Sequence, residues 1–396
     1  MAFDFIAQAL AERRSQGLYR QTSCIEESSA TMLLVDGKHY INFSSNDYLG
    51  MRQSTAVMQG WVDGISQFGG GSGASPLVTG HTCAHQALQD YLAEGLGREK
   101  VLLFSSGFAA NQGICQALMQ AGSHIVADKL MHASLLDGAL ASPGQLSRFR
   151  HNDIGHLTGQ LGQIRHQESQ QQAPQRDILL ATEGVFSMDG DQGPLAELVA
   201  VAEQHQGWLM VDDAHGLGVL GNNGLGSVQA QNLSQQQVPV VMGTFGKAIG
   251  TAGAFVAGSA DLIDYLTNFS RHYIYSTAMP PAQAVATLAS FTDIKQGVKR
   301  DALHHNIELF VQGAKAAGLQ LMPSDTAIQP ILIGNAQATL KASNRLKALG
   351  IWVTPIRSPT VPKGTDRLRV TLSAAHQPRD ISALVDALSL VLHNGS

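Results

Sequence analysis

The chain has 396 residues, 44% of them hydrophobic, and its 26 Lys and Arg against 31 Asp and Glu leave a net charge of −5. A chain of this length can bury a large core, and the lack of a basic run disfavours nucleic-acid binding. The three cysteines are unclustered, no run of 18 apolar residues occurs, and the N-terminus lacks a secretion-signal pattern, so we expect a soluble, cytoplasmic protein without membrane or metal sites.

Short apolar runs alternate with helical patterns between about residue 97 and residue 256. This alternation predicts an open, mostly parallel α/β sheet covered by helices on both faces. The expected strands are residues 101–104, 125–127, 178–182, 209–211, 238–242 and 254–257, and the crossover helices include residues 108–120 and 194–205. The glutamine-rich segments 167–175 and 229–237 lack apolar periodicity, so we expect them to be solvated loops.

The pattern changes after the proline pair Pro280 and Pro281, which predicts a smaller α+β domain. We expect a long helical stretch over residues 282–317, strands at 328–333, 352–354 and 368–372, and a closing helix near 379–392. The chain is therefore divided into an N-terminal segment (1–50), a large α/β domain (51–281) and a small C-terminal domain (282–396).

Lys247 follows the apolar strand 238–242 and lies among small residues. A lysine in such a place suits Schiff-base chemistry, although a solvated surface lysine is the ordinary alternative. Thr244, three residues earlier, could bind a phosphate or a carboxylate, or simply end the strand. Upstream, residues 208–215 (WLMVDDAH) form a second apolar strand that ends in Asp212 and His215.

The lysine and the acid together suggest pyridoxal phosphate (PLP) as the cofactor. A carboxylate opposite the pyridine nitrogen keeps that nitrogen protonated, and His215 lies within reach of the phenolic oxygen of the same ring. The alternative for Asp212 and Asp213 is a helix cap with an incidental histidine. In an open α/β sheet, side chains at the carboxyl ends of strands share one site, so Asp212, His215 and Lys247 are expected together.

Four further segments precede these two strands in the chain. Residues 105–111 (SSGFAAN) follow a strand and open a helix, so their amides could bind a phosphate, although a tight turn would look the same. Residues 68–73 (FGGGSG) follow no predicted strand and are no dinucleotide fingerprint; they suit close approach of a ligand or subunit. His132 could stack on the pyridine ring, and Glu183 and Ser187 could orient oxygens.

These segments, in this order, resemble the α-oxoamine synthases, which are fold type I PLP-dependent enzymes that join an amino acid to an acyl-CoA thioester. The resemblance covers nearly the whole chain. It is carried by residues 43–50 (FSSNDYLG), 182–190 (TEGVFSMDG), 211–216 (VDDAHG), 244–247 (TFGK), 275–281 (YSTAMPP) and 369–376 (RVTLSAAH). It implies a large α/β domain with a mostly parallel sheet and a smaller α+β C-terminal domain.

The resemblance also implies roles for individual residues. In catalysis and cofactor binding, Lys247 binds the cofactor aldehyde, Asp212 the ring nitrogen and His215 the phenolic oxygen, while His132 stacks on the ring. The phosphate would meet the amides of Gly107 and Phe108, with Thr244 nearby and Thr277 supplied by the partner subunit of a homodimer whose sites lie between subunits. Arg369 would hold the amino-acid carboxylate, and the other substrate-contacting positions are Arg20, Asn46, Ser187 and Thr360.

Within that family, the amino-acid sequences of these motifs favour L-alanine and a pimeloyl thioester as the substrates, with the acyl group carried by CoA or by a carrier protein. The nearest alternative is the same chemistry on glycine and acetyl-CoA. An aminotransferase is a further enzymatic alternative, and a non-catalytic PLP-fold binding protein belongs to a different class.

Overall fold

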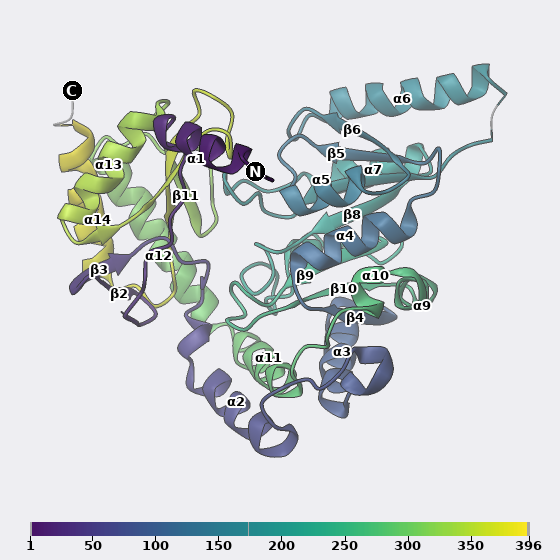
Figure 1. The fold of residues 1–396 in the computed structure, drawn as a ribbon, viewed down its shortest axis with the longest axis horizontal. Coiled ribbons are helices and arrows are strands. Elements are labelled where there is room, and N and C mark those ends of the chain that lie inside the picture. The colour runs from purple at the N-terminus through teal and green to yellow at the C-terminus, as the bar shows by residue number, and fades with distance from the viewer. Residues whose placement is uncertain (1, 173, 394–396) are drawn as a thin grey trace.

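The computed structural model describes residues 2–172 and 174–393, which form two lobes (Figure 1). The larger lobe is built on a seven-stranded sheet in which all neighbouring strands are parallel except β10, which is antiparallel to both of its neighbours. In spatial order the strands are β4 (Lys100–Phe104), β10 (Ala254–Gly258), β9 (Val240–Thr244), β8 (Trp208–Asp212), β7 (Ile178–Glu183), β5 (His124–Asp128) and β6 (Gln145–Phe149). The predicted mostly parallel sheet is confirmed.

Helices cover both faces of this sheet because its strands are apolar on both sides. In β5, Ile125 and Ala127 lie in the core under one set of helices, and Val126 lies in the core under the other set. The first set comprises α4 (Gly107–Leu118), α5 (Ala133–Leu140), α9 (Ala260–Phe269) and α10 (Arg271–Ile274). The opposite face is covered by α3 (Cys83–Leu96), α6 (Ile154–Gln170) and α7 (Leu195–Gln204), with α8 (Ser227–Ala230) beside them.

The smaller lobe combines both ends of the chain. Its four-stranded sheet consists of β1 (Glu27–Ser28), β2 (Met32–Val35), β3 (Lys38–Asn42) and β12 (Ile351–Trp352), with β12 parallel to β3. A three-stranded sheet contains β11 (Ile328–Leu332), β14 (Arg367–Thr371) and β13 (Thr354–Ile356). The helices of this lobe are α1 (Phe5–Ser15), α12 (Val298–Ala316), α13 (Ala336–Ala348) and α14 (Pro378–His393). The three-part division of the chain stays a prediction.

Two helices pack closely at the base of the molecule, where the lobes meet (Figure 1). They are α2 (Thr55–Phe68), which follows the 3₁₀ turn Met51–Gln53, and α11 (Pro281–Ile294); a single π turn, Pro76–Gly80, follows α2. A Cβ atom on Gly60 would lie 2.8 Å from the Cα of Ala286, and one on Gly64 would lie 2.5 Å from the Cα of Ala282. Only glycine permits this approach of the two helix backbones.

The structure corrects several expected elements. The single helical stretch 282–317 is two helices, α11 and α12, separated at Gly297, whose φ of +87° does not fit a right-handed helix. Both glutamine-rich segments begin in a helix rather than a loop: segment 167–175 is helical to Gln170, where α6 ends, and segment 229–237 is helical to Ala230, where α8 ends. The expected strand 352–354 is divided between β12 and β13. In the described part of the chain, no helix is both long and apolar enough to cross a membrane.

Candidate active site

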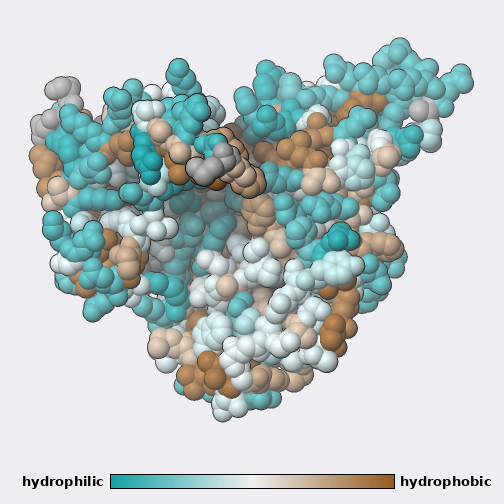
Figure 2. Space-filling view, viewed as in Figure 1, coloured by the Kyte–Doolittle hydropathy of each residue, from teal (hydrophilic) through white to brown (hydrophobic). Residues whose placement is uncertain are grey.

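The expected site forms where the carboxyl ends of the parallel strands meet the smaller lobe. Figure 2 shows the surface deeply hollowed between the two lobes. A cavity of about 180 Å³ collects most of the side chains named from the sequence. Its lining is Gly107, Phe108, Asn111, His132, Ser134, Glu183, Asp212, Ala214, His215, Met242, Thr244 and Lys247.

Lys247 lies in the loop that follows β9, and its ammonium group is withdrawn from solvent. The Nζ atom is 2.8 Å from Nε2 of His215. Burial lowers the pKa of Lys247 to about 8, while the negative charges of Asp212 and Glu183 oppose this shift and Arg369 adds to it. Near neutral pH, a far larger fraction of this amine is therefore unprotonated than in an ordinary lysine, as attack on an aldehyde requires.

Asp212 ends β8 and faces the cavity. Its Oδ2 atom accepts a 2.8 Å hydrogen bond from Nδ2 of Asn111, and its Oδ1 atom accepts one of 3.1 Å from the amide of Ala214. Asn111 Nδ2 also donates to Ser134 Oγ over 2.9 Å. Within the described residues Asp212 forms no ion pair, so a buried carboxylate is held in place without a salt-bridge partner, as a bound cationic ring nitrogen would require.

Asp213 turns away from the cavity. Its two carboxylate oxygens accept hydrogen bonds of 2.7 Å each from the amide and the hydroxyl of Ser227, and burial raises the pKa of Asp213 to about 6. A side chain at Gly216 or Gly226 would collide with this carboxylate. Asp213 therefore braces the loop that follows β8, and of the two neighbouring acids only Asp212 is available to a ligand in the cavity.

His215 connects Lys247 to a buried tyrosine. Its Nδ1 atom is 2.7 Å from the hydroxyl of Tyr48, and that hydroxyl lies 3.2 Å from Oδ1 of Asn46. Burial, with the positive charges of Lys247 and Arg369, holds the pKa of His215 well below its ordinary value. A neutral ring that accepts from Lys247 at Nε2 must carry its proton on Nδ1 and donate it to Tyr48, whose hydroxyl then donates to Asn46.

Two residues line the cavity beside the relay, the hydrogen-bonded chain from Lys247 through His215 and Tyr48 to Asn46. His132 precedes α5, and its Nδ1 atom is 2.7 Å from Ser134 Oγ. Glu183 ends β7 and is 2% exposed; its Oε2 atom accepts from the amide of Ser187 over 3.2 Å, whereas Oε1 has no partner within the described residues. Burial, and then the nearby charge of Asp212, raises the pKa of Glu183 well above its ordinary value. Because a raised pKa favours the protonated carboxyl, Oε1 can carry the proton and donate it to an oxygen of a ligand.

The opposite end of the cavity suits an anion. Helix α4 begins at Gly107, and its N-cap Ser106 accepts from the amide of Ala109 over 3.1 Å, so the amides of Gly107 and Phe108 have no intrahelical acceptor. The positive end of a 12-residue helix stands behind them. An amine, a carboxylate and an anion site thus surround one cavity, and this donor set fits the aldehyde, the ring nitrogen and the phosphate of PLP. Thr244, beside them, donates its hydroxyl hydrogen to the carbonyl of Gly253 over 2.9 Å.

Arg369, on β14, extends from the smaller lobe into the site. Its Nε atom donates to the carbonyl oxygen of Ser187 over 2.7 Å, Nη1 donates to Asn46 Oδ1 over 3.3 Å, and Nη2 lies 3.5 Å from the Tyr48 hydroxyl. All these partners are uncharged, and the residue as a whole is 7% exposed. It therefore retains an unpaired positive charge for a carboxylate.

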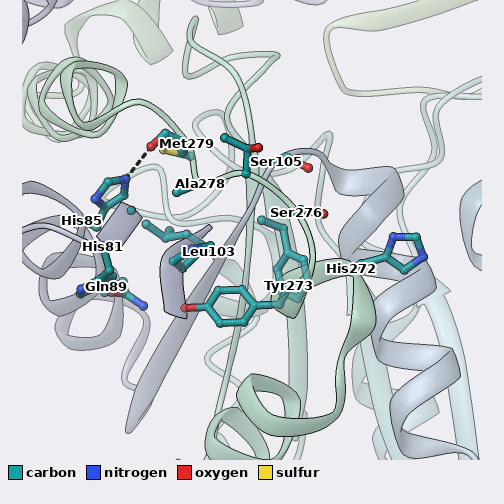
Figure 3. A pocket seen from close by; sticks show the side chains of 14 residues that line it. His81, His85, Gln89, Leu103, Ser105, His272, Tyr273, Ser276, Ala278 and Met279 are labelled. Atoms are coloured by element: carbon teal, nitrogen blue, oxygen red, sulfur yellow. Dashed lines mark hydrogen bonds between the residues drawn. The ribbon is translucent and has the colours of Figure 1, made fainter. Parts of the chain in front are cut away.

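The remaining predicted residues line other pockets. Arg20, Ser187 and Thr360 lie together in a groove of about 830 Å³ that shares His132 with the Lys247 cavity. Thr277 lines a separate pocket beside α3, shown in Figure 3, where Nε2 of His85 lies 2.7 Å from the carbonyl oxygen of Met279. The structure thus brings the cofactor residues together, except Thr277, which was expected to serve the partner subunit.

Three residues that the sequence reasoning did not select occupy the site: Tyr48, Asn111 and Ser134. Tyr48 and Asn111 lie inside the motifs 43–50 and 105–111, and Ser134 lies two residues after His132. Only their partners reveal their importance, and for Tyr48 and Asn111 these are far away in the chain; the Tyr48–His215 contact spans 167 residues and the Asn111–Asp212 contact spans 101. No spacing rule could have connected them.

Comparison with known proteins gives a consistent result. Residues 38–388 match the family model "Aminotransferase class I and II". The chain is 48% identical over 384 residues to the 8-amino-7-oxononanoate synthase of Aeromonas hydrophila subsp. hydrophila, covering 97% of this chain and 94% of that protein. Serine palmitoyltransferase from S. paucimobilis, solved with a bound PLP–myriocin aldimine, superposes with a TM-score of 0.90 at 29% identity, covering 99% of this chain and 98% of the other. The 8-amino-7-oxononanoate synthase of Francisella tularensis gives 0.76 at 28%, covering 90% and 98%.

Proposed function

The chain belongs to the aminotransferase class I and II family, and we propose that it is a PLP-dependent acyltransferase of biotin biosynthesis. It condenses L-alanine with a pimeloyl thioester to give 8-amino-7-oxononanoate, the free thiol and CO₂. The observation that carries this proposal is the 48% identity to a protein named for that product over 97% of the chain. The cavity that contains Lys247, Asp212 and His215 has the side chains that a PLP-dependent reaction of this kind requires.

Each residue of the site has a task in this reaction. PLP, when bound, accepts the electron pair that the amino-acid α-carbon releases on deprotonation and again on decarboxylation. Asp212 keeps the ring nitrogen protonated. Lys247, whose amine has a lowered pKa, removes the α-proton and later returns a proton to the same carbon. Arg369 holds the amino-acid carboxylate by a bidentate pair.

The groove that contains Arg20, Ser187 and Thr360 is the proposed place of the acyl chain. It opens from the Lys247 cavity at His132, so an acyl carbonyl there can approach an amino acid held by Arg369. Bulk solvent is displaced from this approach when the chain fills the groove, which protects the reacting carbon from protonation by water.

We expect purified enzyme to release thiol and form 8-amino-7-oxononanoate from L-alanine and pimeloyl-CoA, with much lower turnover of glycine and acetyl-CoA. Mass spectrometry of both reactions, run side by side with a thiol-release assay, checks this. Faster turnover of the glycine and acetyl-CoA pair would replace the proposal by the related ligase reaction. A keto acid without thiol release would indicate an aminotransferase, and no product from any pair would indicate a binding protein.

We further propose that two copies of this chain form a homodimer through the base of the larger lobe. On α2, the exposed side chains of Met58, Val62 and Ile65 recur on one helix face, and the π turn that follows exposes Leu77 and Val78. This turn lines the same pocket as Thr277, which the proposal assigns to the partner's cofactor phosphate. Such a contiguous apolar surface is typical of an interface.

The expected mass in sedimentation equilibrium is therefore twice that of the 42.0 kDa chain. The substitution Val62→Glu, which places a charge on this exposed face, should shift the population toward the monomer. A monomeric wild-type enzyme with full activity would contradict the dimer.

A cytoplasmic location is also proposed, supported by three cysteines that remain free thiols.

A further inference from the structure

We propose that His151 is a positioning residue that clamps together the two walls of the acyl groove, an inference that rests on the proposed function of that groove. His151 lies just after β6 and does not line the groove itself. Its ring connects a carboxylate at the base of one wall to a carboxylate at the base of the other. None of its contacts involves the cofactor residues directly.

The first wall is the segment 129–132, and Asp128 fixes it. Asp128, fully buried at the end of β5, accepts from Nδ1 of His151 over 3.0 Å at Oδ1. The same Oδ1 accepts from the amide of Leu130 over 2.8 Å, and Oδ2 accepts from the amide of Asn152 over 2.9 Å. Leu130 and the following His132 line the groove, so the carboxylate that binds His151 also sets the path of this wall.

The second wall is the turn 186–189, and Asp191 fixes it. Nε2 of His151 donates to Asp191 Oδ2 over 2.8 Å, and Asn152 Nδ2 donates to the same oxygen over 2.9 Å. The amide of Phe186 donates to the carbonyl of Asp191 over 2.9 Å, and the ring of Phe186 meets the His151 ring edge to face at 4.5 Å. Phe186 and the adjoining Ser187 also line the groove, together with His132.

The ring must carry a positive charge to make both contacts. Each ring nitrogen faces a carboxylate oxygen, which only accepts, so both nitrogens must donate. The charged and titratable groups that face the ring are Asp128 and Asp191, and their hydrogen bonds and charges overcome burial and raise the pKa of His151 to about 10. His151 is thus an imidazolium near neutral pH, in contrast to the neutral His215 of the active site.

This arrangement gives the clamp a specific consequence. If the ring loses its charge or one of its donors, Asn152 is the remaining link between the two carboxylates, and the two walls are held together less firmly. Arg369 of the amino-acid site and Asp212 of the cofactor site do not contact His151; the clamp reaches Arg369 only through the carbonyl of Ser187 and the cofactor cavity only through His132. The clamp therefore acts on acyl binding more than on either of those sites.

The test is the variant His151→Gln in the PLP-loaded enzyme, with His166→Gln as the matched control. His166 is exposed on α6 and contacts the side chain of Gln170. Loss of a charge-assisted hydrogen bond predicts a KM for pimeloyl-CoA about tenfold higher. The KM for L-alanine and the visible absorption of bound PLP should change by less than about twofold, and the control should match the wild type. An unchanged KM for pimeloyl-CoA, or equal rises in both KM values, would overturn the proposal.

Two further measurements keep the proposal testable if that variant does not fold. Asp191→Asn retains the histidine but removes one charge, and it should raise the same KM selectively. In ¹⁵N-labelled wild-type protein, the His151 ring should show two protonated nitrogens at pH 8; a neutral ring there would overturn the clamp. This spectroscopic result does not depend on the substrates, so a protein with a charged His151 but no turnover of pimeloyl-CoA would contradict the proposed function and leave the clamp intact.

Discussion

Replacing Lys247 by alanine is expected to abolish turnover while leaving a folded protein. The variant loses both the amine that binds the cofactor aldehyde and the base that moves the α-proton. General base catalysis alone contributes about 10²–10⁴-fold to the reaction rate. Because the side chain lies at the edge of a cavity rather than in the apolar core, truncation leaves the fold intact. Thiol release measured with pimeloyl-CoA and L-alanine, and circular dichroism of the variant, check the two parts.

The matched control is Lys38→Ala, which removes an exposed lysine from β3 and should keep full activity. Borohydride reduction of the wild-type holoenzyme, followed by peptide mapping, should place the cofactor on Lys247.

Uptake of PLP by cofactor-free enzyme should accelerate as the pH rises through about 8, because the neutral amine is the reactive form and the pKa of Lys247 is lowered to that value. A label on another lysine, or appreciable activity in the alanine variant, would refute the assignment.

The substitution Asp212→Asn is expected to lower kcat by about 10²–10³-fold. The amide preserves the size of the side chain and can still accept from Asn111, but it removes the negative charge that keeps the ring nitrogen protonated. Removal of one preorganised electrostatic group from an active site has effects of this size. Steady-state kinetics with saturating PLP separates this loss from weaker cofactor binding.

Asp213→Asn is the matched control, because the neighbouring acid is equally buried but faces Ser227. It should lower the melting temperature, since an amide cannot accept from both the amide and the hydroxyl of Ser227, and it should reduce kcat far less. If the two variants lost activity equally, Asp212 would have no special role, and the geometry would have been misinterpreted.

The larger lobe could be predicted well because its strands are buried on both faces. Runs such as residues 101–104 and 125–127 are apolar throughout, which is typical of strands in a sheet covered on both faces. Strand β6 was missed because it lies at the edge of the sheet and its residues 145–148 are polar or only half covered. The strands β1 to β3 were missed because they are short and take their last neighbour, β12, from the other end of the chain.

The site could be predicted to the level of which residues share it, but not how they are connected. Asp212, His215 and Lys247 end or follow neighbouring strands, so the rule for open sheets places them together. The relay through Tyr48, the support of Asp212 by Asn111, and the clamp at His151 all depend on contacts between segments distant in the sequence. The catalytic and binding roles of the site residues stay predictions until the variants are measured.

The parallel pairing of β3 with β12 affects how the protein can be made. Ile41 and Ile351 are partners, although about 310 positions separate them. At a translation rate of about 5–20 residues per second, residues 38–42 leave the ribosome roughly 15–60 s before their partner strand exists. All seven strands of the larger sheet are synthesised in that interval, so this sheet can assemble while the nascent N-terminal hairpin still carries an unpaired edge. An unpaired edge of this kind can pair with another chain, and a ribosome stalled before residue 351 would leave it open.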